Sequence, residues 1–477
     1  MKKTVVLYPG LGVGHLVPMV EVAKLFLKHG LAVTMALVEP QVKSTDFSAA
    51  VARARASNPS VAFHVLPTPT PTPPPPADAN TDGAPRHHVV KVIQSLAAMN
   101  APLRDFLRSL PSVHALVLDM FCVDALDVAA ELKLPVYYSF ASGAGDLAIF
   151  LNLPSKFASN TAKVKELGDS IVTFPGVPPF KASELPSEVI GDGEAFMYLL
   201  RMFERMTEAN GILINSLESL EKPAVTALND GLCVTGRATP PVYCIGPLVS
   251  GGGDKEHDCL RWLDAQPDQS VVFLSFGSLG TFSSKQLEEI ALGLDKSGER
   301  FLWVVRSPRS PDQKHGDPLP EPDLDALMPE GFLERTKDRG LVVKSWAPQV
   351  DVLRHRATGA FMTHCGWNST LEGITAGLPL LCWPLYAEQR VNKVHIVDGM
   401  KLGVEMRGYN EEVVKAEEVE EKVRWVMASE GGKALRERVT AAKDAAADAL
   451  KEGGSSYLAF VQFLNDMGTS MVATVQN

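Results

Sequence analysis

Two side chains in the first half of the sequence are suited to acid–base chemistry, His15 and Asp119. His15 lies in the glycine-rich stretch LYPGLGVGHLVP, and an imidazole titrates near neutral pH, as a general base must. Asp119 directly follows the apolar run ALVL, so we expect its carboxylate at the carboxyl end of a buried strand. Because a carboxylate bonded to one imidazole nitrogen stabilises the protonated ring, the sequence predicts His15 as a base and Asp119 as its partner.

Other interpretations of these residues stay open. His15 could be a surface or capping residue of a tight turn, and Asp124 or Asp127 could replace Asp119, although their positions favour the solvated face of the following helix. The glycine-rich stretch also approaches the dinucleotide fingerprint G-x-G-x-x-G but has His15 in place of the third glycine. With Glu39 as a ribose ligand, a nicotinamide-dependent oxidoreductase is a competing class, and a non-catalytic small-molecule binding protein is another.

A possible anion site lies in the second half of the chain. The stretch THCGWNSTLEG follows the apolar run GAFM and opens a helix at Asn368 or Ser369. A helix start offers unpaired N–H groups and the positive end of the dipole, which suit a diphosphate. His364 and Asn368 could add side-chain donors. The competing interpretation is a capping box of Ser369 and Glu372, which would satisfy only the helix itself.

Residues around this helix start are of types that bind a base and hydroxyl groups. Trp346 could stack on a flat base, and Glu372, Glu388 and Gln389 could accept from or donate to ribose and sugar. A D-x-D motif at Asp323–Asp325 lies in a proline-rich stretch without the strand context of a metal-dependent transferase. We therefore expect solvated charge there and no metal site.

These residues require a frame of alternating strands and helices. Helical patterns cover residues 16–30, with Gly30 at the end and Pro18 near the start, and residues 283–298. The pattern predicts an α/β protein with parallel sheets. Short apolar runs predict strands at 4–9, 32–39, 115–121, 135–141, 270–278, 300–306, 341–348, 358–366 and 378–384.

The composition of the chain limits the classes of molecule that it could bind. The 477-residue chain is long enough for more than one core, 45% of its residues are apolar, and its formal charge of −10 disfavours nucleic-acid binding. No window of about 18 apolar residues predicts a membrane span. We therefore expect a monomer in the cytoplasm that binds small molecules. The six cysteines form no metal or disulfide motif: Cys122, Cys233, Cys244, Cys259, Cys365 and Cys382.

The 44-residue stretch from Trp346 to Gln389 resembles the plant secondary product glycosyltransferase signature of UDP-sugar-dependent glycosyltransferases, from W-A-P-Q through H-C-G-W-N-S to E-Q. Three further motifs occur in the order expected for the plant family 1 glycosyltransferases: GVGHLVPM, D-M-F at a strand end, and FGSLG. The resemblance implies the GT-B fold, in which two Rossmann-like domains have parallel sheets facing across a cleft.

The expected domains follow from the resemblance and from local composition. They are an acceptor-binding domain at 1–245, a linker at 246–258, a UDP-sugar-binding domain at 259–455, and a helix at 456–477 that packs back toward the first domain. The glycine triplet at 251–253 suggests a flexible linker. The proline-rich segment 66–83 predicts an extended, mobile surface loop.

The resemblance also implies roles for individual residues. His15 is similar to the family's general base and Asp119 to its orienting partner. Trp346, Ala347 and Gln349 would contact uracil and ribose, and Glu372 the ribose hydroxyls. The diphosphate would be bound by Ser278, His364, Asn368 and Ser369. The sugar would be contacted by Trp367, Glu388 and Gln389, and Gly14 and Ser142 are further expected donor contacts.

The expected reaction is transfer of glucose from UDP-glucose to a flavonoid-like phenolic hydroxyl, with inversion to a β-O-glucoside. Gln389 resembles the glucose-using pattern, and Trp367 stands where related glucuronate users carry arginine. No cofactor is expected beyond UDP-glucose as co-substrate, and C-glycosylation of an activated phenolic ring is the alternative. His87 and His88 could touch the acceptor or be exposed. The expected acceptor pocket is apolar: Met120, Phe121, Phe140, Phe196, Leu200 and Ala387.

Overall fold

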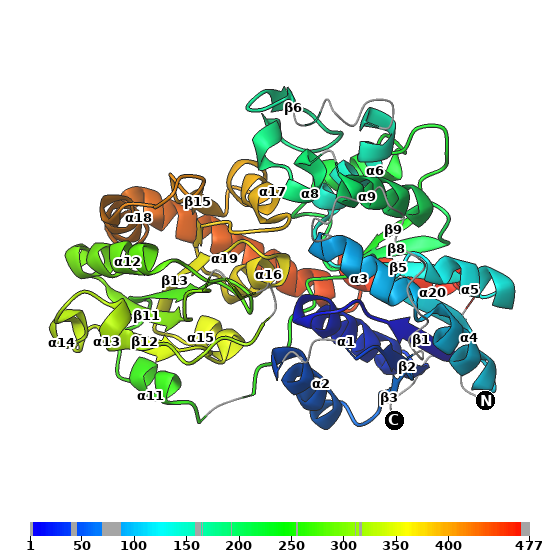
Figure 1. Ribbon diagram of the computed structural model, residues 1–477, viewed down its shortest axis with the longest axis horizontal. Coiled ribbons are helices and arrows are strands. Elements are labelled where there is room, and N and C mark those ends of the chain that lie inside the picture. The colour runs from blue at the N-terminus through cyan, green and yellow to red at the C-terminus, as the bar shows by residue number, and fades with distance from the viewer. Residues whose placement is uncertain are drawn as a thin grey trace. The chain divides into compact units, whose positions relative to one another are not determined.

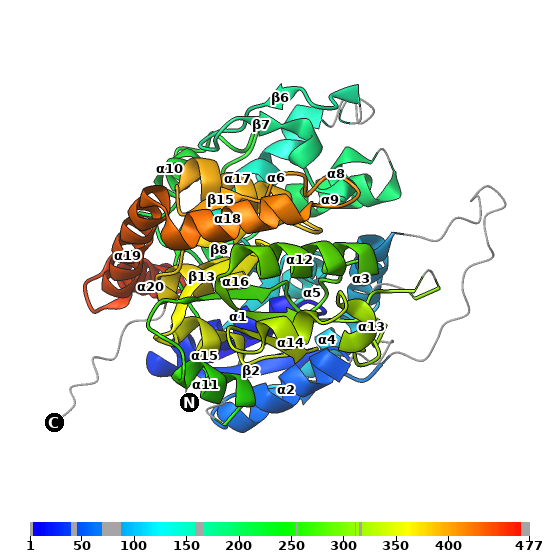
Figure 2. The same ribbon diagram turned by 90° about the vertical axis from the view of Figure 1, so that its left-hand side faces the viewer.

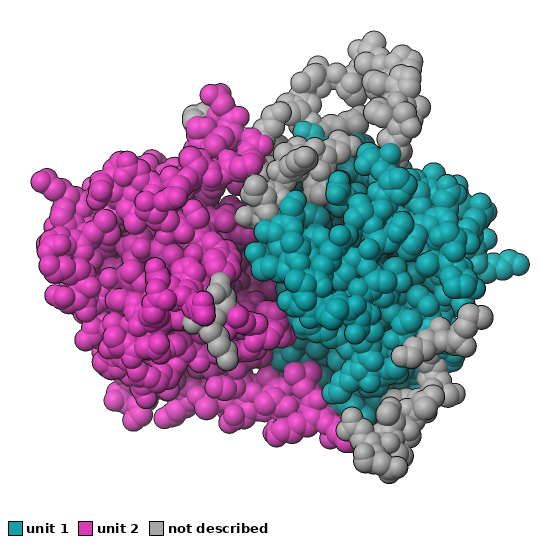
Figure 3. Space-filling model, turned by 90° about the horizontal axis from the view of Figure 1, so that it is seen from below, with its two compact units in different colours: residues 1–218, 222–248, 455–477 teal, residues 219–221, 249–454 magenta. Residues whose placement is uncertain are grey.

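The computed structural model divides into two compact units, coloured separately in Figure 3. Unit 1 comprises residues 1–218, 222–248 and 455–477, and unit 2 comprises residues 219–221 and 249–454. The structure describes residues 3–39, 45–68, 87–157, 164, 166–191, 193–253, 256–310, 312–313 and 317–468. Most of the proline-rich segment 66–83 therefore lies outside the described residues.

Unit 1 is built on a seven-stranded parallel sheet among the described residues, in the order β3-β2-β1-β4-β5-β8-β9 (Figure 1). Its strands are β1 (Thr4–Tyr8), β2 (Ala32–Leu37), β3 (Ala62–Val65), β4 (Ala115–Asp119), β5 (Val136–Phe140), β8 (Gly211–Ile214) and β9 (Val242–Cys244). A separate antiparallel pair is formed by β6 (Ile171–Val172) and β7 (Phe180–Lys181).

Helices follow most strands of this sheet, as parallel connections require. They are α1 (Val13–Lys28), α2 (Thr45–Ser57), α3 (His88–Ala97), α4 (Asn100–Ser109), α5 (Ala125–Leu132), α6 (Ala144–Phe157), α8 (Ser187–Ile190), α9 (Glu194–Met206), α10 (Lys222–Asn229) and α20 (Ser455–Asp466), with a 3₁₀ turn, η1, at Ala182–Glu184.

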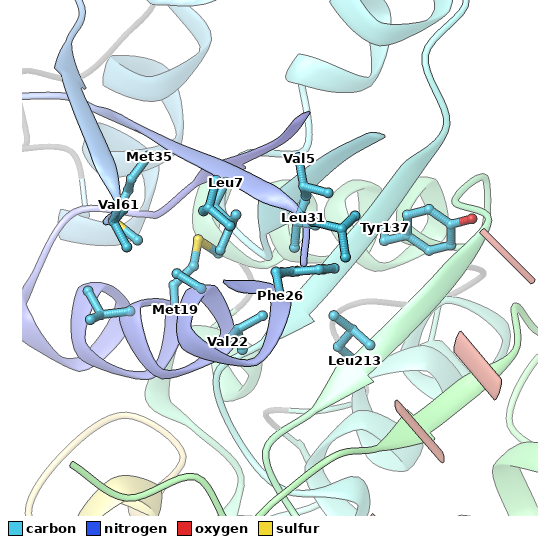
Figure 4. Packing of buried hydrophobic residues seen from close by; sticks show 14 of the residues in the cluster. Val5, Leu7, Met19, Val22, Phe26, Leu31, Met35, Val61, Tyr137 and Leu213 are labelled. Carbon is cyan, nitrogen blue, oxygen red and sulfur yellow. The ribbon is translucent and has the colours of Figure 1, made fainter. Parts of the chain in front are cut away.

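Helix α1 forms because its apolar residues recur every three or four positions and bury one face. In Figure 4, Met19, Val22 and Phe26 point from α1 toward Leu7 and Leu213 of the sheet. The helix begins at Val13, earlier than the sequence pattern predicted. His15 therefore lies in its first turn, and Pro18 lies inside the helix rather than near its start.

Helix α20 packs into the core of unit 1, although it comes from the end of the chain. Phe460 and Phe463 belong to the same buried cluster as α1, with both rings edge-on to Phe26 at 5.4 and 5.9 Å. Burying each such ring contributes roughly 1.5–3 kcal/mol. The hydroxyl of Tyr243 on β9 donates to the Asp466 carboxylate at 2.7 Å and fixes the far end of the helix.

Unit 2 is built on a six-stranded parallel sheet among the described residues, in the order β12-β11-β10-β13-β14-β15. Two of these strands, β13 and β15, are labelled in Figure 2. Val272 and Leu274 of β10 face one buried cluster, and Val271 and Phe273 face the other. This alternation places apolar cores on both faces of the sheet. The strands are β10 (Val271–Ser275), β11 (Arg300–Val305), β12 (Gly340–Lys344), β13 (Thr358–Thr363), β14 (Leu380–Cys382) and β15 (Gly403–Glu405).

The helices of unit 2 cover both faces of its sheet, and α12 packs along α18. They are α11 (Asp258–Asp264), α12 (Ser284–Ser297), α13 (Leu324–Leu327), α14 (Phe332–Thr336), α15 (Gln349–Arg354), α16 (Trp367–Ala376), α17 (Gln389–Val394), α18 (Ala416–Ala428) and α19 (Glu430–Leu450), with a π-helical turn, η2, at His395–Gly399. In the described part of the chain, no helix has the length and apolarity needed to cross a membrane.

The glycine triplet differs from the flexible linker that its composition predicted. The N–H of Gly253 donates to both carboxylate oxygens of Asp351 at 3.1 and 3.2 Å, and Arg354 donates to the carbonyl of Gly251 at 3.0 Å. Residues 251–253 are therefore held against α15 in unit 2.

Candidate active site

In unit 1, the structure brings His15 and Asp119 together. β1 and β4 are neighbouring parallel strands, so Asp119, at the carboxyl end of β4, lies beside the turn that leads from β1 into α1. His15 Nδ1 donates to Asp119 Oδ2 at 2.8 Å. Asp119 is only 1% exposed, whereas the His15 ring is 22% exposed. We call these two residues, which are the predicted catalytic residues, the catalytic pair.

Backbone groups hold the aspartate in place. The N–H of Phe121 donates to Asp119 Oδ1 at 3.0 Å, so each carboxylate oxygen accepts a hydrogen bond. A Cβ atom at Gly10 would lie 2.4 Å from Asp119 Oδ1. Because a Cβ atom would clash with this carboxylate, position 10 of the glycine-rich stretch must be a glycine. With Nδ1 donating, the basic nitrogen of the neutral ring is Nε2.

Asp124 and Asp127 do not compete for the histidine. Arg201 of α9 donates to Asp124 at 2.6 Å, and Arg205 donates to Asp127 at 2.6 Å. These pairs join α5 to α9. The expectation of a purely solvated face was therefore wrong for Asp124, whose side chain is mostly buried.

The hydroxyl of Ser142 forms a hydrogen bond within unit 1. Its Oγ donates to the carboxylate of Asp146, one turn further along, and both side chains are buried. Gly14 lies in the first turn of α1 with open space where a Cβ would be. Both stay predicted donor contacts.

The predicted acceptor residues divide between core and surface. Phe140 and Phe196 lie in the core of unit 1, and Phe140 packs edge-on against Phe150 at 6.3 Å. Phe121 is partly exposed, with its ring 5.0 Å from that of His15. The remaining three are Met120 and Leu200, buried in unit 1, and Ala387, which lies in unit 2 with a φ of 53°.

Unit 2 contains the predicted anion site. α16 begins at Trp367, and its N-cap is Gly366, which has no side chain to cap the first turn. The first N–H groups of a helix have no partner within the helix, so this end suits an anion. Ser369 is the third residue of the helix rather than its cap. The capping-box interpretation of Ser369 and Glu372 is therefore wrong.

His364 follows β13 directly and is buried beside this helix start. Burial lowers the pKa of its imidazole to about 4, so the ring is neutral near pH 7. A Cβ atom at Gly366 would lie 2.5 Å from His364 Nε2. Its Nδ1 is buried without a hydrogen-bond partner among the described residues. A neutral imidazole in this place can donate one N–H to a phosphate oxygen.

Gln349, the first residue of α15, connects three elements. Its Nε2 donates to Ser369 Oγ at 2.8 Å and to Glu372 Oε2 at 2.6 Å, and its Oε1 accepts from Ser275 Oγ at 2.8 Å. Glu372 is partly exposed, and desolvation raises the pKa of its carboxyl to about 7 against the opposite effect of the Gln349 hydrogen bond.

Trp346 and Ser278 lie on loops that Arg306 joins. Arg306 donates to the carbonyl of Ser345 at 3.2 Å and to the carbonyl of Ser278. Trp346 is 46% exposed, with the His257 ring 5.8 Å away at an edge-on angle. An exposed indole can stack on a flat base. Ala347, the next residue, is buried.

Hydrogen bonds also connect the end of the 44-residue signature, at Glu388, to the start of α16. Gln389 is buried, and its Oε1 accepts from the N–H groups of Leu385 and Tyr386, both at 3.0 Å. Asn392 donates to the carbonyl of Cys365 at 2.9 Å and to Glu388 Oε1 at 3.4 Å. Trp367 is buried, and Asn368 follows it in the first turn of α16.

Sequence reasoning missed Ser275, Arg306 and Asn392. Asn392 follows the signature by three residues, on the same helix as Gln389, and helical spacing could have indicated it. No group of three or more His, Cys, Asp or Glu suited to a metal occurs in the part of the chain that the structure describes. In the D-x-D motif, Asp323 Oδ1 accepts from the N–H of Ala326 and caps α13.

These two units, each with a parallel sheet and a polar site, have the GT-B fold of sugar-nucleotide transferases, which confirms the predicted fold class. A family model described as UDP-glucoronosyl and UDP-glucosyl transferase matches residues 240–434. The chain is 40% identical to an anthocyanidin 5,3-O-glucosyltransferase from a Rosa hybrid cultivar, over 95% of this chain and 96% of the other. It is also 40% identical to a phloretin 2'-O-glucosyltransferase from Pyrus communis, over 98% of this chain and 100% of the other.

A solved structure of UGT2 from Phytolacca americana, in complex with UDP-2-fluoro-glucose and pterostilbene, matches with a TM-score of 0.85 and 34% identity, over 98% of this chain and 100% of the other. The chain belongs to the UDP-glucoronosyl and UDP-glucosyl transferase family and is a UDP-glycosyltransferase of the plant type. The prediction of this family is confirmed, and the oxidoreductase and non-catalytic alternatives are set aside.

Proposed function

We propose that this protein transfers glucose from UDP-glucose to a hydroxyl group of a small phenolic acceptor and forms a β-O-glucoside. The observation that carries the proposal is the 2.8 Å hydrogen bond between His15 and Asp119, in a chain whose relatives are named as glucosyltransferases of phenolic compounds. This pair can remove a hydroxyl proton near neutral pH.

The reaction is a single displacement. His15 Nε2 accepts the proton of the acceptor hydroxyl, and the acceptor oxygen forms a bond to the anomeric carbon of glucose. The bond from that carbon to the diphosphate oxygen breaks, and UDP leaves with the electron pair. Because attack and departure occur on opposite faces, an α-linked donor gives a β-linked product. Asp119 stabilises the imidazolium that forms.

Unit 2 would bind the donor. Trp346 would stack on uracil, with Ala347 and Gln349 beside it, and Glu372 would accept from the ribose hydroxyls. The start of α16 and the neutral His364 would donate to the diphosphate and stabilise the charge that develops on UDP. Ser278, Asn368 and Ser369 would add contacts there, and Trp367, Glu388 and Gln389 would contact glucose.

The experiment that tests this function is incubation of the purified protein with UDP-glucose and a panel of flavonoids and simpler phenols. We expect at least one acceptor to gain one hexosyl unit by mass spectrometry. Acid hydrolysis should release glucose from the product, since an O-glycoside is acid-labile and a C-glycoside is not. A product that resists hydrolysis would overturn the O-linkage, and transfer to no acceptor would overturn the proposed substrate class.

We also propose that the transfer needs no metal ion. The support is chemical: a neutral histidine and a helix start can serve the diphosphate, and the D-x-D motif is used as a helix cap. Activity after treatment with EDTA should equal that of the untreated protein, and full restoration by added Mg²⁺ or Mn²⁺ of an activity lost to EDTA would contradict this.

We further propose a monomer that works in the cytoplasm. All six cysteines lie among the described residues, are buried and form no disulfide, which fits a reducing compartment. Light scattering on the eluted protein should give the mass of one chain, and a concentration-independent dimer would contradict it. A fluorescent fusion that accumulates in the secretory pathway would contradict the location.

A further inference from the structure

Ser275 is a buried polar residue that the signature does not include. It is the last residue of β10, and its Oγ lies 2.8 Å from Gln349 Oε1. It stands three residues before Ser278, on the strand that leads into the predicted phosphate loop. Its hydroxyl therefore reaches the site from a different element than α15 and α16.

The amide of Gln349 has one favourable orientation beside an ionised Glu372. An amide group has two N–H donors on nitrogen and only acceptor positions on oxygen. The nitrogen lies 2.6 Å from Glu372 Oε2 and 2.8 Å from Ser369 Oγ. An amide oxygen facing the Glu372 carboxylate at that distance would be repelled. Nitrogen must face Glu372, and Ser275 must then donate its hydroxyl proton to the amide oxygen.

We propose that Ser275 and Gln349 form a hydrogen-bond relay that positions the Glu372 carboxylate to accept from the ribose hydroxyls of the donor. This inference rests on the proposed function, which supplies the ribose. In this account Gln349 is a positioning residue, since both of its N–H groups are used within the protein.

Loss of the Ser275 hydroxyl would affect Glu372 in two steps. Gln349 Oε1 would lose its donor in a partly buried place, so the amide would no longer be held firmly in its position. A displaced amide would weaken the N–H bond that favours the charged carboxylate. The carboxylate would then leave its position or take up a proton, and either change removes an acceptor from the ribose.

The test compares UDP with 2',3'-dideoxy-UDP, which lacks both ribose hydroxyls, by isothermal titration calorimetry. The variants are Ser275→Ala, Gln349→Ala and the double variant. We expect Ser275→Ala to weaken UDP binding about three- to tenfold and binding of the dideoxy analogue less than twofold. Ser275→Ala should add nothing in the Gln349→Ala background, because members of one relay are not additive.

Two further variants separate positioning from folding. Ser275→Thr keeps the hydroxyl and should restore UDP affinity toward the original value. Ser297→Ala is the matched control, because Ser297 is also buried in unit 2 but donates only to the carbonyl of Leu294 on α12. It should leave the affinities for both ligands unchanged.

Equal losses for UDP and the dideoxy analogue in Ser275→Ala would overturn the relay, as would additive losses in the double variant. Equal affinity of the unaltered protein for the two ligands would also overturn it, because the hydroxyls would then contribute nothing. Failure of the unaltered protein to bind UDP at all would instead overturn the proposed function.

Discussion

The polar sites of the two units differ in how firmly their side chains are held. In unit 1 a hydrogen bond joins the two residues of the catalytic pair, which are 104 positions apart in the sequence. The ring of His15 is partly exposed. In unit 2 the polar side chains bond to one another and to loop backbones, and Gln349 alone connects Ser275, Ser369 and Glu372.

The difference follows from what each site has to do. A base must change its protonation state in every cycle, so solvent and substrate must reach it. Groups that bind a sugar nucleotide must keep one orientation, which burial and mutual hydrogen bonds enforce. We therefore expect changes in unit 1 to alter the rate of transfer and changes in unit 2 to alter the binding of the donor.

The largest effect should come from His15→Ala. Loss of a positioned base should lower kcat by roughly 10³–10⁴-fold, because no other group would take the hydroxyl proton. Calorimetry should show UDP affinity unchanged, since the proposed UDP site lies in unit 2. Transfer within tenfold of the original rate would remove His15 from the mechanism.

Asp119→Asn should have the next largest effect on kcat, roughly 10²-fold or more. The amide can present N–H toward His15 and favour the wrong tautomer, so the basic nitrogen no longer faces the acceptor. Asp127→Asn is the control, because that carboxylate is 66% exposed and pairs with Arg205. Equal rates for the two variants would show that Asp119 does not act through His15.

Donor binding should depend on pH through Glu372. Its pKa is raised to about 7 by burial, and in the proposed donor complex the ionised form would accept from the two ribose hydroxyls. Affinity for UDP-glucose should therefore increase as pH rises from 6 to 8, by about five- to tenfold. His364, with a pKa of about 4, is neutral throughout this range.

Glu372→Gln is the control for this pH dependence, because it keeps the shape of the side chain and removes its titration. Its affinity should be low and independent of pH. If the dissociation constant decreased equally for the unaltered protein and for Glu372→Gln as the pH rises, the effect would belong to another group.

The smallest effect should follow from Gln389→His. The Gln389 oxygen accepts from two backbone N–H groups, which orients its nitrogen, and an imidazole cannot reproduce this arrangement. The ratio of kcat/KM for UDP-glucose to that for UDP-galactose should fall about three- to tenfold, with UDP affinity unchanged. An unchanged ratio would mean that Gln389 does not select the sugar.

The two units also differ in how far their sites could be predicted from the sequence. The predicted donor residues of unit 2 lie mostly within one stretch of 44 residues, so their order along the chain already places them around one helix start. The catalytic pair depends on β1 and β4 being neighbours. The expectation that strand ends meet at one edge of a sheet was enough to pair His15 with Asp119.

The contacts that sequence reasoning missed are bonds between elements. Ser275 meets Gln349, and Arg306 meets Ser278, only because of strand register and side-chain rotamers, which no local pattern specifies. The capping-box alternative arose because Ser369 has the sequence pattern of an N-cap, whereas the helix starts at Trp367 and its N-cap is Gly366. Ser142 and Asp146, four residues apart at a helix start, were within reach of a sequence argument.

The most direct test of the central claim is a proton NMR time course of UDP-glucose with a phenolic acceptor found in the panel. For the unaltered protein, we predict that the α-anomeric signal of the donor decreases while a β-anomeric signal of the glucoside appears, and that His15→Ala gives neither change. A product that first appears as the α-anomer, or equal product formation by His15→Ala, would contradict the account.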